Sequence, residues 1–500
     1  MSTVDQGNSM SDSGADVSGA ISREALAGRL PVQGSNRLYN GFGSLLAACV
    51  AIGAASFNYL FGASIAYIGN TSIGIAGYLI GLIVGLAPVY LASGMICFRH
   101  GVDPVDAAKS SMGTRGSSLL LALILITTLG WSFVLIAMTG QAAGRLQQLL
   151  FNPGAEIDNG FVATVSVLML ALVWTLLRKG PAMIALLTRY TSPAILIIAC
   201  ILLYLITRDT SLTTLLHTNV DAKSAYTTDP LLQLAYGVEF GASNALTSVP
   251  FFGGIARLIH KRKHLITPSL LGAGLIGAGF TSAVGALAAV ATGSTEPAEW
   301  VIKTAGNGVG TVIVSVLLLA NLGTLISFFY FAGVSVQQVR FFARMRWDMI
   351  ILVLLLPGLV VAFNTQWLIA HVMNWLAYNS AIFAGIAAVL LTDFLLLRRQ
   401  VLLPTHLFVK SEEGAYWFWG GVNWVAMATI ALGATVYLML FDPLTLAVGP
   451  SFRYVGATMP TLAVCVLAYY LAMRLVIASS YKGGYRNVRQ LALKKVTVGL

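Results

Sequence analysis

Charged residues are scarce in this sequence. Asp, Glu, Lys and Arg together make up 10% of its 500 residues, whereas soluble domains carry about 25%. An ordinary soluble domain is therefore excluded. No pair of the four cysteines has metal-ligand or redox spacing, and the six histidines do not cluster within an apolar run; His260 and His264 flank a basic stretch that is better interpreted as a solvated face. No acid pair and no nucleophile beside a base lies deep in the apolar segments, so the sequence does not indicate an enzyme active site.

Long apolar runs dominate the sequence instead, and hydrophobic residues make up 57% of it. Twelve runs approach the length of about 20 residues that a transmembrane helix needs. No stretch between them is long enough for a separate soluble domain, such as the signalling domain of a receptor. We therefore expect an all-α membrane protein with twelve transmembrane helices. The runs cover residues 42–67, 73–97, 117–144, 161–177, 181–207, 231–257, 267–291, 310–336, 348–364, 367–396, 417–440 and 459–478.

The net charge of +11 follows the predicted topology. If both termini are cytoplasmic, 23 of the 30 Lys and Arg residues fall on the inner side and five on the outer side. This positive-inside bias orients the chain, with His217 and Lys223 outside. We therefore interpret the basic excess as a topology signal in a lipid bilayer, the plasma (inner) membrane, and not as a nucleic-acid site. Residues 1–40 lack the apolar region of a signal peptide, so we expect a disordered cytoplasmic tail there and a second, basic cytoplasmic tail at residues 479–500.

The run at residues 231–257 is badly suited to be a simple membrane anchor. Glu239 lies in its outer half, small and polar residues surround that acid, and Pro250 interrupts the far end. Glycine and proline weaken a helix interior, and non-helical backbone is tolerated at membrane depth only beside protein or a water-filled cavity. An ionisable residue there indicates a functional site. We therefore expect a broken helix that forms the wall of a binding site.

The run at residues 42–67 is equally irregular, with Gly53, Asn58 and Gly62 in its interior. Close helix packing would also explain its small residues. Because the two irregular runs are five spans apart, they cross the membrane in opposite directions, as the first helices of an inverted repeat do. We expect one repeat at 41–207, an inverted second repeat at 230–397, and two extra helices at 417–478.

Three further features have two readings each. Trp131 lies far from the membrane interface and either fills space or stacks on a planar ligand. Arg189 either snorkels to the inner interface or has an internal structural or ion-site role. Asn321, Thr324 and Ser327 recur at a spacing of three, so they lie near one helix face. Their oxygens suit a small hard cation, but Ser and Thr commonly bond to their own helix.

Five segments together resemble the nucleobase:cation symporters, on the cytosine-permease side. They are LGW at 129–131, the loop at 101–118, VEFGASN at 238–244, LLTDFLLLRRQ at 390–400 and GGVNWVA at 420–426. The resemblance runs from about residue 40 to 440. It implies twelve helices, a five-plus-five inverted repeat of the leucine-transporter type and alternating access. It also implies uptake of a purine, pyrimidine or related ring coupled to sodium or protons.

The resemblance also assigns roles to individual residues. Trp131 and Phe240 would stack on the two faces of the substrate ring, with polar groups such as Glu239 at its edge. The expected substrate-binding residues are Thr128, Trp131, Glu239, Phe240, Asn244 and Ser327. The expected cation site, or a substitute for it, comprises Val50 and Gly53 through their carbonyls, Arg189, Asn321 and Thr324.

The sequence departs from the family pattern near that cation site. Leu325 replaces a second hydroxyl, and Phe328 stands where an amide or acid often follows. We therefore expect uptake driven by protons through Glu239, or uncoupled from ions, with Arg189 as a fixed substitute for sodium. Ordinary sodium symport is the alternative. No cofactor beyond a coupling ion and no obligate protein partner are expected. An amino-acid or amine transporter on the same fold is the second functional hypothesis, ahead of a membrane-embedded enzyme or receptor.

Overall fold

The computed structural model describes residues 31–32, 34, 37–152, 155–178, 182–221, 225–480 and 482–485, apart from the side chains of 182–189, 192, 250 and 340. Within these residues the fold is helical, and β-bridges occur only as isolated pairs. Seven helices in the described part are long and apolar enough to cross a membrane, and a bent helix pair makes an eighth. The all-α membrane class is therefore confirmed, while this criterion does not establish the expected number of twelve spans.

Helices nevertheless occupy each of the twelve predicted runs, with π-helical turns inside three of them. In chain order these helices are α2 (Phe42–Gly53) with α3 (Phe57–Ala66), α4 (Thr71–Val89) with η2 (Tyr90–Gly94) and α5 (Met95–His100), α7 (Ser117–Phe151), α8 (Asn159–Leu177), α9 (Ala182–Asp209), α11 (Pro230–Leu246) with α12 (Val249–Ala256), α13 (Thr267–Ser269) with η4 (Leu270–Gly279) and α14 (Phe280–Thr292), α15 (Pro297–Val336), α17 (Trp347–Ala362), α18 (Thr365–Ala370) with α19 (Val372–Leu391) and η5 (Thr392–Leu397), α20 (Trp424–Leu440), and α22 (Thr458–Ser479).

Shorter helices lie in the connections. They are α6 (Pro104–Met112), α10 (Leu212–His217), η3 (Arg262–His264), α16 (Arg340–Ala343), η6 (Pro404–Leu407), α21 (Phe452–Val455) and η7 (Lys482–Gly484).

Both irregular runs are broken helices, as predicted. α2 ends at Gly53, α3 starts at Phe57, and the two axes differ by 65°. α11 ends at Leu246 and α12 starts at Val249, with Pro250 in its first turn. Proline is tolerated there because the first amide groups of a helix have no partner within the helix. Each break leaves backbone groups that are free to meet side chains or a ligand.

The two broken helices pack in equivalent ways. A Cβ built on Gly285 of α14 would lie 3.3 Å from the Cα of Gly62 in α3. A Cβ built on Gly237 of α11 would lie 3.0 Å from the Cα of Gly77 in α4. The first span thus packs closely on the seventh, and the sixth packs on the second, through small residues that let backbones approach. This exchange of partners is what an inverted repeat of five helices requires.

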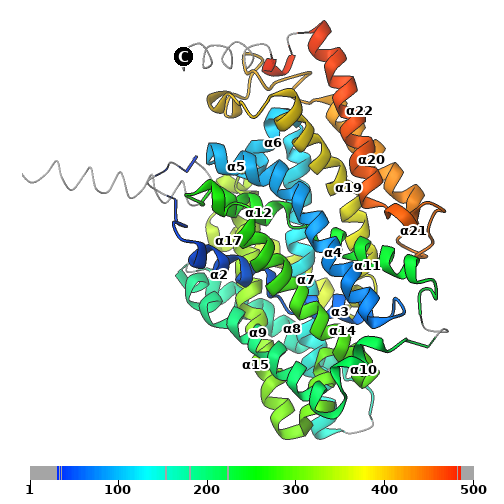
Figure 1. Cartoon of the computed structure of the whole chain (residues 1–500). Helices are drawn as coiled ribbons and strands as arrows, with labels where there is room; N and C mark the ends of the chain where they lie inside the picture. Colours follow the sequence, from blue (N-terminus) through cyan, green and yellow to red (C-terminus); the bar gives the residue numbers. More distant parts are fainter. Residues whose placement is uncertain are drawn as a thin grey trace, which may run out of the picture.

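The last two long helices lie outside the repeat. In Figure 1, α20 and α22 run side by side along one edge of the bundle, next to α19. Gly385 of α19 packs against the backbone of Ile430 in α20, and Gly433 of α20 packs against Cys465 in α22. These helices therefore cover the second repeat.

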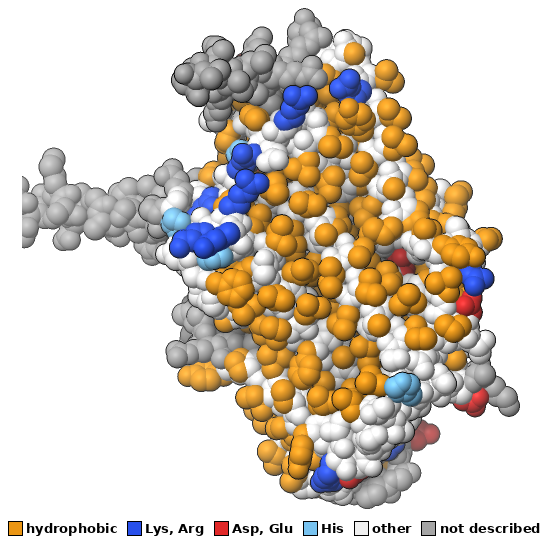
Figure 2. Space-filling view, in the orientation of Figure 1, with side chains coloured by type: hydrophobic (Ala, Val, Ile, Leu, Met, Phe, Trp, Pro, Cys, Tyr) orange, Lys and Arg blue, Asp and Glu red, His pale blue; other side chains and the backbone are white. Residues whose placement is uncertain are grey.

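Contacts between loops define two opposite faces. The α6 face joins residues near 98–116 to 398–423: Arg99 donates to the Gln400 carbonyl at 2.8 Å, and the Arg115 amide donates to the Gly421 carbonyl at 2.8 Å. On the α10 face, Arg453 pairs with Asp229 at 3.0 Å. In Figure 2, apolar side chains cover most of the visible surface and Lys and Arg gather mainly at the upper left. This distribution is what a chain embedded in a bilayer needs.

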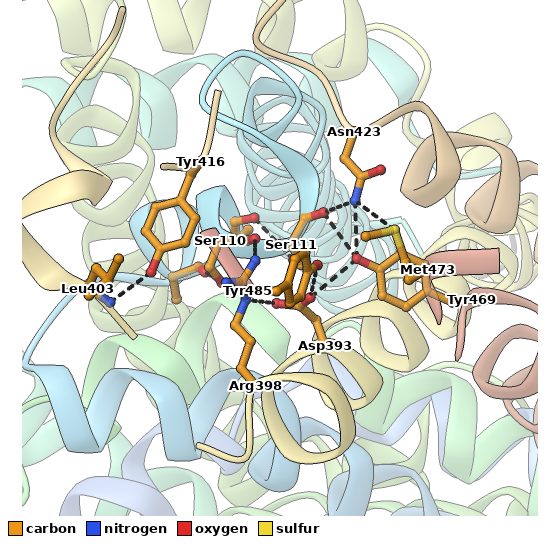
Figure 3. Close-up of polar contacts among 12 residues, drawn as sticks. Ser110, Ser111, Asp393, Arg398, Leu403, Tyr416, Asn423, Tyr469, Met473 and Tyr485 are labelled. Atoms are coloured by element: carbon orange, nitrogen blue, oxygen red, sulfur yellow. Dashed lines mark hydrogen bonds and ion pairs between the residues drawn. The ribbon is translucent and has the colours of Figure 1, made fainter. Parts of the chain in front are cut away.

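A buried polar cluster ties the α6 face together (Figure 3). Asp393 pairs with Arg398 at 2.6 Å, and both side chains are almost fully buried. Arg398 also donates to the Ser110 carbonyl at 2.6 Å, and its guanidinium lies 4.0 Å from the centre of the Tyr485 ring. Tyr485 donates to Asp393 at 2.5 Å. The cluster therefore attaches α6 and the segment after α22 to the end of α19.

Candidate substrate pocket

A pocket lies where the two helix breaks meet. About 500 Å³ of space that no protein atom fills, open solvent included, lies between its walls. Its walls come from the α2–α3 break, the end of α11, α12, α4, α7, η4 and α15. The lining residues are Ile52, Gly53, Phe57, Asn58, Leu82, Leu86, Trp131, Asn244, Ala245, Thr247, Ser248, Phe251, Phe252, Ala273, Gly274, Ala278 and Phe328.

Trp131 forms one aromatic wall together with Phe57. Their ring centres are 4.3 Å apart with an angle of 21° between the planes, so the rings are stacked. Trp375 meets Trp131 edge-on at 5.0 Å. It comes this close because a side chain on Gly130 would lie 2.3 Å from the Trp375 ring. Trp131 is therefore held rigidly at the pocket, with Phe57 on one of its faces.

A second aromatic pair closes another side of the pocket. Phe251, in the first turns of α12, stacks on Phe328 of α15 with ring centres 5.1 Å apart and 26° between the planes. Such offset aromatic arrangements present flat apolar surfaces to a planar ligand. The pair also joins α12, the second half of the broken sixth span, to α15, the eighth span.

The polar groups of the pocket form one network. Asn58 donates to the Gly53 carbonyl at 2.7 Å, and Asn244 donates to Asn58 at 3.3 Å and to the Tyr78 hydroxyl at 2.7 Å. Ser282 adds a bond to the Asn58 carbonyl at 2.9 Å. The two broken helices are thus joined directly, through the two amides. None of the residues that line this pocket carries a charge.

A larger hollow, with about 1420 Å³ of unoccupied space, lies toward the α10 face. Side chains of α3, α7, α15 and α19 line it together with loop residues such as Glu296 and Leu444. Ser56 lines this hollow, whereas its neighbour Phe57 lines the pocket. The stacked Phe57 and Trp131 rings therefore lie beside the boundary between the two spaces.

Glu239 does not line either space in the structure. It is 2% exposed, and its carboxylate accepts hydrogen bonds from the Ala457 amide at 2.8 Å, the Thr458 amide at 3.0 Å and the Thr458 hydroxyl at 2.6 Å. These donors form the start of α22, where an acid is favoured by the unpaired amides and the helix dipole. Glu239 thus attaches α11 to α22, and its contact with a ring edge stays a prediction.

The structure places Trp131 and Phe240, the two rings of the expected sandwich, at different spaces: Trp131 lines the pocket and Phe240 does not. Phe240 lines the larger hollow and packs against Tyr226 and Tyr236, at ring distances of 6.3 and 6.2 Å. It lies four residues before Asn244, about one turn of α11 farther from the break. The aromatic side chains that the sixth span contributes to the pocket are Phe251 and Phe252.

Two other expected substrate ligands lie outside the pocket lining. Thr128 is buried, and its carbonyl accepts from the Ser132 hydroxyl at 2.8 Å. Ser327 donates to the Gly323 carbonyl of its own helix at 2.9 Å, which is the local bonding that the sequence left open. Asn244 and Trp131 are the expected substrate ligands that the structure places at the pocket.

The expected cation ligands have other partners in the structure. The Val50 carbonyl accepts from the Ala54 amide at 2.7 Å, and the Gly53 carbonyl accepts from Asn58. Asn321 accepts from Ser56 and donates to Thr139 at 3.1 Å, at the wall of the larger hollow. The group at Val50, Gly53 and Asn321 is therefore not arranged as a ready set of oxygen ligands.

Thr324 and Arg189 are the remaining members of the expected cation site. Thr324 is partly buried on α15, beside Gly323, where a Cβ would lie 2.2 Å from the Thr191 hydroxyl of α9. α9 thus packs on α15 at this level, as expected for the fifth span. The side chain of Arg189 lies outside the described residues.

Sequence reasoning did not select Phe57, Asn58, Phe251 and Phe328, which the structure places at the pocket. Asn58 and Phe57 stand in the irregular part of the first span, and that irregularity was the available signal. Phe251 follows Pro250 at the second break. Its proximity to Phe328 depends on how two distant helices pack, which no local pattern indicates.

Long apolar helices, two broken spans exchanged between equivalent partners, and a pocket at their junction define a secondary transporter with an inverted repeat and alternating access. The chain belongs to the family described as permease for cytosine/purines, uracil, thiamine, allantoin, whose model matches residues 38–457. It is a transporter and not an enzyme. None of the curated proteins compared with the sequence matches it.

Solved structures agree with this fold. An inward-facing conformation of Mhp1 superposes with a TM-score of 0.74 at 19% identity, over 92% of this chain and 96% of that one. A closed conformation of Mhp1, a nucleobase-cation-symport-1 family transporter with bromovinylhydantoin bound, gives 0.70 at 18% identity, over 90% and 96%. A Na+-coupled sialic acid symporter gives 0.55 at 11% identity, over 90% of each chain. The leucine-transporter-like inverted repeat is thereby confirmed.

Proposed function

We propose that the protein imports a neutral, planar heterocycle of the nucleobase type and binds it in the pocket between the two helix breaks. The observation that carries this proposal is the combination of flat aromatic walls with two amides and no charged side chain in the pocket lining. Aromatic faces favour a flat ring, and buried amides need polar partners. Bromovinylhydantoin, the ligand bound in the closed conformation of Mhp1, belongs to the same chemical class.

The competing hypothesis is an amine or amino-acid carrier on the same fold. A buried cation is costly without an opposite charge, and Glu239, the acid expected near the pocket, is engaged by the start of α22. This favours the neutral ring. A carboxylate in the pocket would require a ring edge made of hydrogen-bond donors. Because Glu239 is engaged at the start of α22, this requirement does not apply, and rings with carbonyl groups on their edge are also possible substrates. Uptake of labelled cytosine, uracil, guanine and hydantoin, compared with a panel of amino acids and amines, tests the proposal. Uptake confined to the amines or amino acids would contradict it.

We further propose that uptake does not require sodium. Three features support this: Leu325 is buried where the family pattern has a hydroxyl, Asn58 holds the Gly53 carbonyl, and Asn321 is engaged by Ser56 and Thr139. A proton, or no ion, would then accompany the substrate. Glu239 is not proposed as the carrier of that proton, because three hydrogen-bond donors already hold its carboxylate. Initial uptake rates in vesicles at fixed pH, with sodium replaced by choline, test this; a large loss of uptake would contradict it.

The α6 face is proposed to be cytoplasmic, in the plasma (inner) membrane. The charge distribution of the sequence supports this orientation. A single cysteine placed at residue 262, which is exposed on the α6 face, is expected to react with an impermeant maleimide only after the cells are opened. Reaction in intact cells would reverse the assignment.

A further inference from the structure

The orientation of the pocket amides follows from one backbone carbonyl. The Gly53 carbonyl can only accept a hydrogen bond, so the group of Asn58 that lies 2.7 Å from it is the amide nitrogen. Gly53 has little freedom to move, because a Cβ at this position would lie 2.3 Å from the Ala273 carbonyl oxygen. Amide orientation is assigned from such contacts, and here the break between α2 and α3 sets it.

The orientation of Asn58 then determines that of Asn244. With its nitrogen at Gly53, Asn58 presents its side-chain oxygen to Asn244, 3.3 Å away. Only the nitrogen of Asn244 can donate to that oxygen, and the same nitrogen donates to the Tyr78 hydroxyl at 2.7 Å. Both protons of the Asn244 amide are therefore used.

Two hydrogen-bonding groups are left over at the pocket. The side-chain oxygen of Asn244 accepts no hydrogen bond from the described residues, and Asn58 has one N–H proton without an acceptor among them. Asn58 and Asn244 are 1% and 7% exposed, and both line the pocket. The Asn244 oxygen is not one of the described side-chain atoms that are fully buried without a partner, so it is accessible in the pocket, where a ligand can donate to it.

We propose that Asn58 and Asn244 are specificity residues that read adjacent N–H and C=O groups on the edge of a neutral ring. The ring N–H donates to the oxygen of Asn244, and the neighbouring ring carbonyl accepts from the nitrogen of Asn58. This rests on the proposed function and narrows it to rings with a lactam edge, such as uracil, cytosine, guanine or hydantoin. Tyr78 is a positioning residue, since it holds the nitrogen of Asn244 away from the ligand.

The inference predicts that the affinity for the substrate depends on the proton of its ring N–H group. Replacing the ring N–H by N–CH₃ leaves the Asn244 oxygen without a donor and adds a group that cannot approach it. Since 1.4 kcal/mol corresponds to a factor of ten in affinity, and an unsatisfied buried group costs about that amount or more, methylation should weaken binding about tenfold or more. In Asn244→Leu, which offers no acceptor, the ratio between the unmethylated and methylated rings should fall toward one.

The experiment compares uracil with 1,3-dimethyluracil, and hydantoin with 1,3-dimethylhydantoin. Ligand-induced thermal stabilisation of the purified full-length protein gives the affinities, and uptake in vesicles is the second readout. Asn379→Leu is the matched control: Asn379 is also a buried asparagine, but it pairs with Thr127 at 3.0 Å and does not line the pocket. Tyr78→Phe, which keeps the ring and removes only the hydroxyl, is the second test and replaces Asn244→Leu if that variant does not fold. It should lower the ratio between the affinities for the unmethylated and the methylated rings.

The outcomes separate the inference from the proposed function. Selective binding of the unmethylated rings that is lost in Asn244→Leu and kept in Asn379→Leu supports the inference. Equal binding of methylated and unmethylated rings by the unchanged protein overturns it but leaves ring transport intact. An unchanged ratio in both Asn244→Leu and Tyr78→Phe overturns it as well. Failure of every ring, including cytosine and guanine, to bind or to be transported refutes the proposed function itself.

Discussion

Replacement of Glu239 distinguishes an acid that anchors two helices from one that binds substrate. The carboxylate accepts from the Ala457 and Thr458 amides and from the Thr458 hydroxyl. Glu239→Ala leaves these three buried donors without their acceptor. At about 1–3 kcal/mol for each unsatisfied group, the loss of unfolding free energy is about 3 kcal/mol or more. Such a loss is a large fraction of the 5–15 kcal/mol that typical proteins have.

Glu239→Gln should be much milder. The remaining carbonyl oxygen of Gln can take both amides, and the Thr458 hydroxyl can turn to accept from the new NH₂ group. What is lost is the negative charge at the start of α22, typically 0.3–1 kcal/mol and up to about 2 kcal/mol when partly buried. We expect a small fall in melting temperature and an unchanged substrate affinity.

The assay measures the melting temperature of the detergent-purified protein together with the KM for uptake. Thr458→Ala is the matched control, because it removes the hydroxyl from the same contact and leaves Glu239 in place. We expect the order Glu239→Ala, Thr458→Ala, Glu239→Gln from most to least destabilised, with similar KM values among the folded variants. A Glu239→Gln protein with normal stability and a KM raised tenfold would refute the reasoning and restore a direct role in substrate binding.

Other predictions concern the pocket wall, the α6-face cluster and the loop helix. Trp131→Ala should raise KM about tenfold, because about 1.4 kcal/mol of ring stacking is lost. Trp424→Ala, at an exposed position, is the control and should leave KM unchanged. Equal effects of the two substitutions on KM would contradict a role of Trp131 in the pocket. Arg398→Ala should lower stability by about 3–5 kcal/mol, since it leaves Asp393 buried and unpaired; a melting temperature equal to that of the unchanged protein would refute this. Burial, with a smaller effect of Asp106, raises the pKa of Asp103 at the start of α6 to about 7. The stability that the protonated form contributes is therefore lost as the pH rises from about 4 to 7, and melting curves of Asp103→Asn, which has no proton to lose, should lack this fall.

Local features of the sequence predicted the membrane class, the helix positions and both helix breaks. Scarce charge and long apolar runs exclude other classes because a bilayer penalises unpaired polar backbone and charged groups wherever they occur. The break near Gly53 and the break before Pro250 follow from glycine and proline chemistry that acts within a few residues. Trp131 and Asn244 could be selected because each is unusual for its position within a span.

Contacts between distant segments were beyond such reasoning. The sequence indicates that Glu239 is a buried acid, but its partner lies more than 200 residues away at the start of α22, so no local pattern could indicate that contact. Phe240 and Phe251 stand on the same broken span, and the sequence offers no reason to prefer the second as a pocket aromatic. The choice depends on which side of the break each ring reaches.

The sequence by itself determined that this chain forms a bundle of membrane helices with two discontinuous spans. Those properties come from hydrophobicity, charge and backbone propensity, which are sums over nearby residues. Only the tertiary structure decided which side chains meet at the junction. Asn58, Asn244 and Tyr78 come from three different helices, and the direction of their hydrogen bonds depends on the Gly53 carbonyl. That carbonyl is held by close packing of Gly53 against Ala273. The sequence could not show these hydrogen bonds, because their direction depends on atoms that only the fold brings together.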